Sequence, residues 1–160
     1  MKYNAITTCD IVNGEGLGVV LWCQGCDLRC KGCHNQDTWE FNHGIIFDEA
    51  AKSKILQELQ RPYITRLTLS GGHPLAPQNI NDCLDLCRHV KTNMPEIQIW
   101  VYTGYHFEDI KNYEILNYID VLVDGPFELS QRDITLPFRG SRNQRIFKKI
   151  KNKWRLIKYE

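Results

Sequence analysis

The fold of this chain of 160 residues is decided by the stretch Gly18-Val-Val-Leu-Trp-Cys-Gln-Gly-Cys-Asp-Leu-Arg-Cys-Lys-Gly-Cys33. Its first part, residues 18–22, is a short aliphatic run that predicts a buried strand. The strand leads into Cys26, Cys30 and Cys33, whose C-x3-C-x2-C spacing can place three thiolates around one face of an iron–sulfur cube. Because a 4Fe–4S cluster usually takes four cysteines, three ligands from one loop leave one iron open. An open coordination position distinguishes a catalytic metal site from a closed structural one.

The composition is that of an ordinary globular domain. Apolar residues make up 42% and charged residues 24% of the chain, and its length suits one domain with a hydrophobic core. No apolar run approaches the ~20 residues of a membrane span, and the N-terminus lacks the apolar segment of a signal peptide. Four of the seven cysteines lie between positions 23 and 33, which favours a metal in a reducing cytoplasm over disulfides. We expect one cytoplasmic domain over residues 1–160.

The net charge of +1 hides an uneven distribution. Residues 139–160 carry nine Lys or Arg against one acidic residue, whereas the other 138 residues carry 11 basic and 18 acidic side chains. We interpret this basic C-terminal segment as a solvated end of the chain. The alternative is a docking surface for an acidic partner. Nucleic acid is disfavoured because the segment has no recognisable nucleic-acid-binding fold.

Strand and helix patterns alternate beyond the cysteines. We expect strands at 18–22, 64–69, 97–102 and 119–123, helices at 48–60 (with Asp48 as its N-cap) and 78–93, and a weaker helix at 107–118. This order favours an α/β fold with a parallel sheet and crossover helices. Because a full eight-stranded barrel needs about 250 residues, we expect a partial, incomplete TIM-like β/α barrel.

Special residues follow the carboxyl ends of the expected strands. They are the cysteine loop, Ser70-Gly71-Gly72, Thr103-Gly104 and Asp124-Gly125. Ligands of parallel α/β folds bind at that edge of the sheet, so the four signals converge on one rim. A Gly-Gly pair after a strand can be a plain turn, but beside the cysteine loop we favour the explanation that the missing side chains let backbone groups approach a ligand closely.

Three kinds of metal site fit the cysteines. We favour the open-site cluster on Cys26, Cys30 and Cys33. Cys23 would add a fourth ligand for structural zinc, but zinc-binding C-x2-C pairs are usually separated by a dozen or more residues, and here they are three apart. A fully ligated electron-transfer cluster is the third possibility. Cys23 also lies at the end of the expected strand, where its side chain can belong to the core.

The other candidate ligands have simpler explanations. Cys83 and Cys87 lie four residues apart on an apolar helix stripe and are expected to be small buried hydrophobes. Cys9 has no visible partner. His34 is of interest because it directly follows Cys33. Three tryptophans lack the interleaved basic residues of a stacking platform and are expected to pack in the core: Trp39, Trp100 and Trp154.

The cysteine motif and the later Gly-Gly segment resemble those of the radical S-adenosylmethionine enzymes. Within that superfamily, further stretches are similar to the activating proteins of anaerobic ribonucleoside-triphosphate reductases. The matching stretches are Cys26-Asp-Leu-Arg-Cys-Lys-Gly-Cys-His-Asn35 with Thr38-Trp39, Leu69-Ser-Gly-Gly-His-Pro-Leu75 with Pro77-Gln78-Asn79, Trp100-Val-Tyr-Thr-Gly-Tyr105, Asp120-Val-Leu-Val-Asp-Gly-Pro-Phe127 and Arg139-Gly-Ser-Arg-Asn-Gln-Arg145.

The resemblance implies a mechanism. Cys26, Cys30 and Cys33 would hold three irons of a 4Fe–4S cluster, and the methionine amino and carboxylate groups of S-adenosylmethionine would chelate the fourth. An electron donor such as a flavodoxin would supply one electron, and a 5′-deoxyadenosyl radical would form. That radical would take a hydrogen atom from a glycine of the reductase large subunit, leaving a glycyl radical there.

The resemblance also implies which residues contact S-adenosylmethionine. Gly71 and Gly72 would offer backbone carbonyls to its ammonium group, and Cys33 and its neighbours would lie along the nucleoside. The full set is Gly32, Cys33, His34, Gly71, Gly72, His73, Pro74 and Thr103. Two positions depart from the superfamily pattern: His73 stands where an acid is common, and Gly32 where an aromatic residue is frequent.

Other functions remain open on the residues alone. The target could be another glycyl-radical enzyme or a small molecule, although a truncated barrel with one open side suits a protein loop better. A different class of function is a zinc-dependent module that docks nucleic acid through residues 139–160, which would bind with a steep salt dependence.

Overall fold

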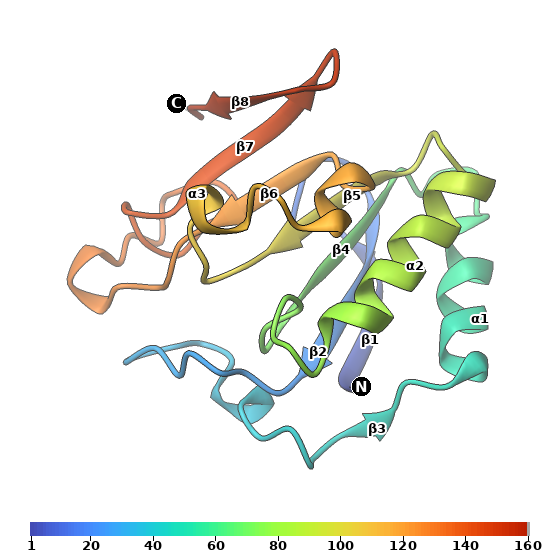
Figure 1. Ribbon diagram of the computed structural model, residues 1–160, viewed down its shortest axis with the longest axis horizontal. Helices are drawn as coiled ribbons and strands as arrows, with labels where there is room; N and C mark the ends of the chain where they lie inside the picture. The colour runs from blue at the N-terminus through green and yellow to red at the C-terminus, as the bar shows by residue number, and fades with distance from the viewer. Residues whose placement is uncertain (160) are drawn as a thin grey trace.

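A single eight-stranded sheet organises the computed structural model, which describes residues 1–159 (Figure 1). Its strands are β1 (Lys2–Asp10), β2 (Gly18–Gln24), β3 (Ile45–Ile46), β4 (Arg66–Gly71), β5 (Gln98–Tyr102), β6 (Val121–Asp124), β7 (Arg145–Ile150) and β8 (Lys153–Ile157). They are ordered β3-β1-β2-β4-β5-β6-β7-β8. The four central strands, β2, β4, β5 and β6, pair in parallel, as expected. The pairs on either side of them are antiparallel.

The helices connect the parallel strands, with short 3-10 turns elsewhere. They are α1 (Glu49–Leu59), α2 (Ile80–Asn93), α3 (Phe107–Ile110), η1 (Gln36–Thr38), η2 (Glu114–Asn117) and η3 (Leu129–Gln131). The Asp48 side chain accepts a hydrogen bond from the Ala51 backbone N–H at 2.9 Å, which confirms it as the N-cap of α1. Among residues 1–159, none of these helices is long and apolar enough to cross a bilayer.

Two sequence-based expectations are wrong. The helix expected at 107–118 is divided into α3 and η2, because Tyr113 adopts an extended conformation (ψ 131°) between them. The basic C-terminal segment is not a solvated end, because most of it forms the antiparallel hairpin β7–β8. β7 pairs with β6, buries Ile146 and Phe147, and begins with Arg145, which donates to the buried Asp124 carboxylate. The charged residues of the segment are thus carried on an edge of the sheet.

The two faces of the sheet have different roles. Alternate residues of each strand point to opposite faces; on β5, Ile99 and Val101 join the main core with α1 and α2. Trp100 belongs to a second cluster, which includes Val121 and has Phe138 packed against it. The cluster on this second face lies next to the loop between β1 and β2, residues 11–17, which folds back over the sheet.

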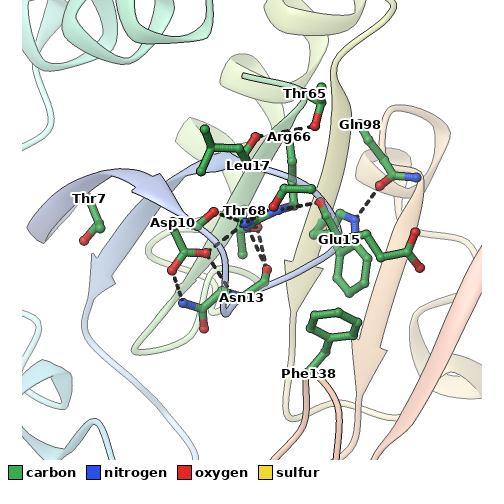
Figure 2. Close-up of polar contacts among 12 residues, drawn as sticks. Thr7, Asp10, Asn13, Glu15, Leu17, Thr65, Arg66, Thr68, Gln98 and Phe138 are labelled. Atoms are coloured by element: carbon green, nitrogen blue, oxygen red, sulfur yellow. Dashed lines mark hydrogen bonds and ion pairs between the residues drawn. The ribbon is translucent and has the colours of Figure 1, made fainter. Parts of the chain in front are cut away.

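A buried arginine holds that returning loop. Figure 2 shows the guanidinium of Arg66, on β4, surrounded by the loop. Its nitrogens donate to the backbone carbonyls of Asp10 at 2.7 Å, Asn13 at 2.9 Å and Glu15 at 3.1 Å. It also forms an ion pair with the Asp10 carboxylate at 2.8 Å. Because the Arg66 side chain is fully buried, these partners are what makes its charge tolerable in the fold.

The ion pair predicts a dependence of stability on acid pH. Burial alone would raise the pKa of Asp10, but hydrogen bonds from Asn13 and Arg66 hold it below its ordinary value of 3.8. A folded-state pKa below the unfolded one stabilises the fold above the unfolded pKa, and this contribution is lost as pH falls through the folded pKa. We expect the free energy of unfolding to decrease as the pH is lowered from about 5 to about 2, with a smaller slope in Asp10→Asn. Urea unfolding at a series of pH values measures both slopes, and equal slopes would contradict the assignment.

Candidate metal and cofactor site

The cysteine loop, residues 25–35, begins on a stem of backbone hydrogen bonds. The Gly25 N–H donates to the Thr38 carbonyl at 2.6 Å, and the Cys26 N–H donates to the Trp39 carbonyl at 3.0 Å. On the other side, the His73 N–H donates to the Gly25 carbonyl at 2.9 Å. The start of the loop is therefore fixed between the turn after β4 and the segment around η1.

The Gly71-Gly72 pair allows this close approach. Gly71 has φ +95°, a conformation that side chains rarely adopt. A Cβ on Gly72 would lie 2.4 Å from the Gly25 carbonyl oxygen and 2.7 Å from that of Thr38. Sequence reasoning assigned the missing side chains to ligand contact; the structure shows that they also bring the cysteine loop against the sheet.

Asn79, just before α2, fastens the same two turns together. Its buried side-chain amide donates to the carbonyls of Gln24 at 3.2 Å, Gly25 at 3.3 Å and His73 at 3.0 Å. One side chain thus serves carbonyls from both the stem of the cysteine loop and the turn after β4. Asn79 was noticed in the sequence only as part of a family-like stretch, because its partners are distant along the chain.

The three motif thiols face one cavity of about 450 Å³. Burial raises the pKa of Cys30, the neighbouring Cys26 and Cys33 raise it further, and a hydrogen bond from the Phe127 backbone N–H opposes the rise. The Asn35 backbone N–H donates to the Cys33 sulfur at 3.3 Å. Three neighbouring thiols, two of which have an N–H donor at the sulfur, are a donor set that suits a positively charged iron centre.

The cavity collects most of the predicted site residues. Its size falls within the range of about 300–1,000 Å³ that small-ligand pockets occupy. Gly32 and Pro74 are absent from its wall, although both adjoin residues that belong to it. The predicted residues on the wall are Cys26, Cys30, Cys33, His34, Gly71, Gly72, His73 and Thr103.

His73 has no free ring nitrogen. Its Nδ1 lies 2.5 Å from Asp27 Oδ1, and its Nε2 lies 2.7 Å from Thr103 Oγ1. The hydroxyl of Tyr105 donates to Asp27 Oδ2 at 2.6 Å. Burial lowers the pKa of His73, and the Asp27 carboxylate works against that shift. The histidine side chain is therefore engaged with the protein, and Asp27 and Tyr105 are site residues that sequence reasoning missed.

Cys23 points away from the cysteine loop, as its strand position predicted. Its sulfur lies 3.8 Å from that of Cys83, inside the main core, and Cys87 belongs to the same core. The expectation that Cys83 and Cys87 are small buried hydrophobes is confirmed. The position of Cys23 removes the fourth ligand that a zinc knuckle would need. Within residues 1–159, no three His, Cys, Asp or Glu side chains converge on one metal-ion position.

The loop between β6 and β7 supplies a wall of which the sequence predicted only the start, Asp124-Gly125. Figure 1 shows it in orange, on the same side of the sheet as the light-blue cysteine loop. Phe127 packs edge-to-face against His34 at 5.3 Å between ring centroids. Arg139 also lines the cavity; its Nη1 donates to the Gln144 carbonyl at 2.9 Å, and its buried Nε has no hydrogen-bond partner among residues 1–159. Both residues lie in stretches that resemble the family.

The opposite end of the cavity is formed by the returning β1–β2 loop. Val12 and Asn13 contribute to the wall together with Phe138, whose backbone carbonyl accepts a hydrogen bond from the Tyr102 hydroxyl at 2.7 Å. These positions carried no sequence signal, because their role depends on how Arg66 folds the loop back.

Comparisons with known proteins agree with this site. Residues 12–147 match the family model of the 4Fe-4S single cluster domain. The anaerobic ribonucleoside-triphosphate reductase-activating protein of Enterobacteria phage T4 is 43% identical over 155 residues, which cover 97% of this chain and 99% of the relative. Proteins of the same name from Haemophilus influenzae and Escherichia coli K12 are 42% and 39% identical, over 91% and 90% of this chain and 97% and 96% of their own lengths. The resemblance to the activating proteins, predicted from the cysteine motif together with the later stretches, is thereby confirmed, and the chain belongs to the family of anaerobic ribonucleoside-triphosphate reductase-activating proteins.

Proposed function

We propose that this protein activates an anaerobic ribonucleoside-triphosphate reductase by forming a glycyl radical on its large subunit. The observation that carries the proposal is the cavity that the three motif thiols share with the Gly71-Gly72 turn. A 4Fe–4S cluster held by these thiols would pass one electron from an external reductant to S-adenosylmethionine, and the reductive cleavage would supply the radical chemistry that removal of a glycine hydrogen needs.

The residues present fit these cofactors. Cys26, Cys30 and Cys33 would hold three irons, and the backbone N–H groups of Phe127 and Asn35 would stabilise the ligating sulfurs. Gly71 and Gly72 would direct backbone carbonyls to the ammonium of S-adenosylmethionine. Gly32, Cys33 and His34 would line the nucleoside, with Pro74 and Thr103 nearby.

His73 would contribute to cofactor binding through its backbone and its ring face, because both ring nitrogens are occupied. Arg139 is a further contact that the structure suggests. A guanidinium is always charged at neutral pH, and no carboxylate of residues 1–159 forms an ion pair with Arg139. It would attract the carboxylate of the methionine moiety.

The remaining features complete the proposal. The parallel strands and the cavity on the face away from α1 and α2 support an incomplete TIM-like barrel, formed by one radical S-adenosylmethionine domain over residues 1–160. Its open side would admit a loop of the reductase, whose target glycine has no side chain to obstruct entry. The electron donor would be a small reductant such as a flavodoxin, and the redox chemistry suits a reducing cytoplasm.

The proposal predicts activity that depends on the cluster. We expect the anaerobically reconstituted protein to be brown, to hold about four irons per chain, and to release 5′-deoxyadenosine from S-adenosylmethionine after dithionite reduction. Addition of the reductase large subunit is expected to give the electron paramagnetic resonance signal of a glycyl radical. The matched controls omit dithionite or S-adenosylmethionine. A colourless protein with zinc alone, or a loaded cluster that never yields the glycyl radical, would overturn the proposal.

A further inference from the structure

Four side chains connect the cysteine loop to the ends of two parallel strands. They are Asp27, His73, Thr103 and Tyr105, named here the loop brace. Asp27 lies inside the cysteine loop, His73 follows β4, and the other two follow β5. The brace spans 46 residues of sequence between Asp27 and His73, and 78 between Asp27 and Tyr105.

Each side-chain polar group of the loop brace has a hydrogen-bond partner within the brace. The Tyr105 N–H donates to Thr103 Oγ1 at 3.1 Å, which leaves the threonine hydroxyl free to donate to His73 Nε2. The Nδ1–H group of His73 then donates a hydrogen bond to Asp27 Oδ1, and the Tyr105 hydroxyl donates one to Asp27 Oδ2. A neutral histidine with its proton on Nδ1 completes this chain of donors and acceptors. Networks satisfied in this way have one defined geometry.

The position of the brace in the loop indicates what it does. The backbone stem ends at Cys26, so Asp27 is the first residue beyond the stem that is fastened to the sheet. Leu28 packs against Gly104, between the two brace residues that follow β5, so two consecutive residues dock on the same turn. A further polar contact of this stretch, the Arg29–Glu40 ion pair at 2.9 Å, is half-exposed and therefore weak.

We propose that the loop brace is a positioning device that sets the path of the cysteine loop between Cys26 and Cys30. The proposal rests on the function proposed above and explains why a histidine serves at position 73. The carboxylate of this site is carried by the cysteine loop itself, at Asp27, and His73 is its partner. Asp27 and His73 are thus a matched pair, and changing one without the other disrupts the loop.

The first test removes one hydrogen bond of the brace. Tyr105→Phe deletes only the hydroxyl that donates to Asp27. We expect a chelator such as bipyridyl to strip iron from the reconstituted variant faster than from the wild type, by up to the about 10-fold that losing a direct partner of a metal ligand costs, because Tyr105 acts on the cysteines only through Asp27. The matched control is Tyr113→Phe, because Tyr113 is exposed and lies outside the cavity. Urea unfolding is expected to give similar midpoints for both variants, which separates positioning from general stability.

The second test exchanges the pair. His73→Asp places a second carboxylate opposite Asp27 in a site where residue 73 is 1% exposed, so repulsion is expected to displace the loop. We expect this variant to lose iron at least about 10-fold faster and to give an altered electron paramagnetic resonance spectrum in the reduced state. The double variant Asp27→His with His73→Asp restores one carboxylate and one imidazole, and is expected to recover most of the iron retention.

These outcomes separate the brace from the proposed function. Iron retention is measured without reductase or S-adenosylmethionine, so it does not depend on which protein is activated. Wild-type retention in both Tyr105→Phe and His73→Asp, or a double variant no better than His73→Asp, would overturn the loop brace. A wild-type protein that keeps its cluster but forms no glycyl radical would instead overturn the function.

Discussion

Cys30→Ala is expected to abolish cluster binding and, with it, cleavage of S-adenosylmethionine. Changes to residues that merely support metal ligands cost about 10–100-fold, so loss of a ligand is expected to exceed about 100-fold in both iron affinity and turnover. Cys30 lies between the other two thiols of the motif, and its pKa is raised by burial and by their charges. The two remaining thiolates are too few to hold a cluster that takes three ligands from the protein. Iron analysis and 5′-deoxyadenosine release measure the two losses.

The matched control for this loss is Cys23→Ala. Cys23 belongs to the same sequence cluster, but its sulfur faces Cys83 in the core at 3.8 Å. Removing it leaves a small cavity, for which we expect a loss of about 1 kcal/mol in the free energy of unfolding, with iron content and activity close to those of the wild type. If Cys23→Ala lost its iron as Cys30→Ala does, the assignment of three ligands would be wrong.

Arg66→Leu is expected to lower the free energy of unfolding by about 3–5 kcal/mol, the cost typical of breaking a buried ion pair. The change leaves the Asp10 carboxylate without its cation and removes the donor to the backbone carbonyls of Asp10, Asn13 and Glu15. Because single domains are stable by only about 5–15 kcal/mol, such a loss brings the protein near the unfolding threshold. Urea unfolding of the metal-free protein measures it.

Two further variants test the cause of that loss. Arg61→Leu removes a surface arginine whose partner, Glu58, lies three residues away, and is expected to change stability little. Arg66→Leu combined with Asp10→Leu removes both buried charges and is expected to recover part of the loss. An Arg66→Leu protein as stable as Arg61→Leu would show that the loop 11–17 is held by something other than the guanidinium.

The central parallel strands were predictable because their residues are buried on both faces. β2 reads as a short aliphatic run, β4 alternates leucines with polar residues, and the cap at Asp48 identified the start of α1. β1 was missed because it exposes polar residues, and β8 because it lies at the edge of the sheet and alternates with charges. Edge strands are chosen by their neighbours in space, which local patterns do not record.

The candidate site was predictable as far as its local motifs reach. Cysteine spacing identified the three ligands, and the Gly-Gly pair identified the turn beside them. The loop brace could not be predicted from the sequence, because the role of His73 depends on its hydrogen bond with Asp27, which lies 46 residues away. The same holds for Asn13 and Phe138, which reach the cavity wall because Arg66 and Tyr102 bind their backbones.

The loop of residues 11–17, which Arg66 holds over the sheet, affects how a protein substrate can enter the cavity. Val12 and Asn13 of this loop, together with Phe138, line the cavity that the three motif thiols face. A polypeptide that brings its glycine to the thiols would enter a space that these three side chains help to limit.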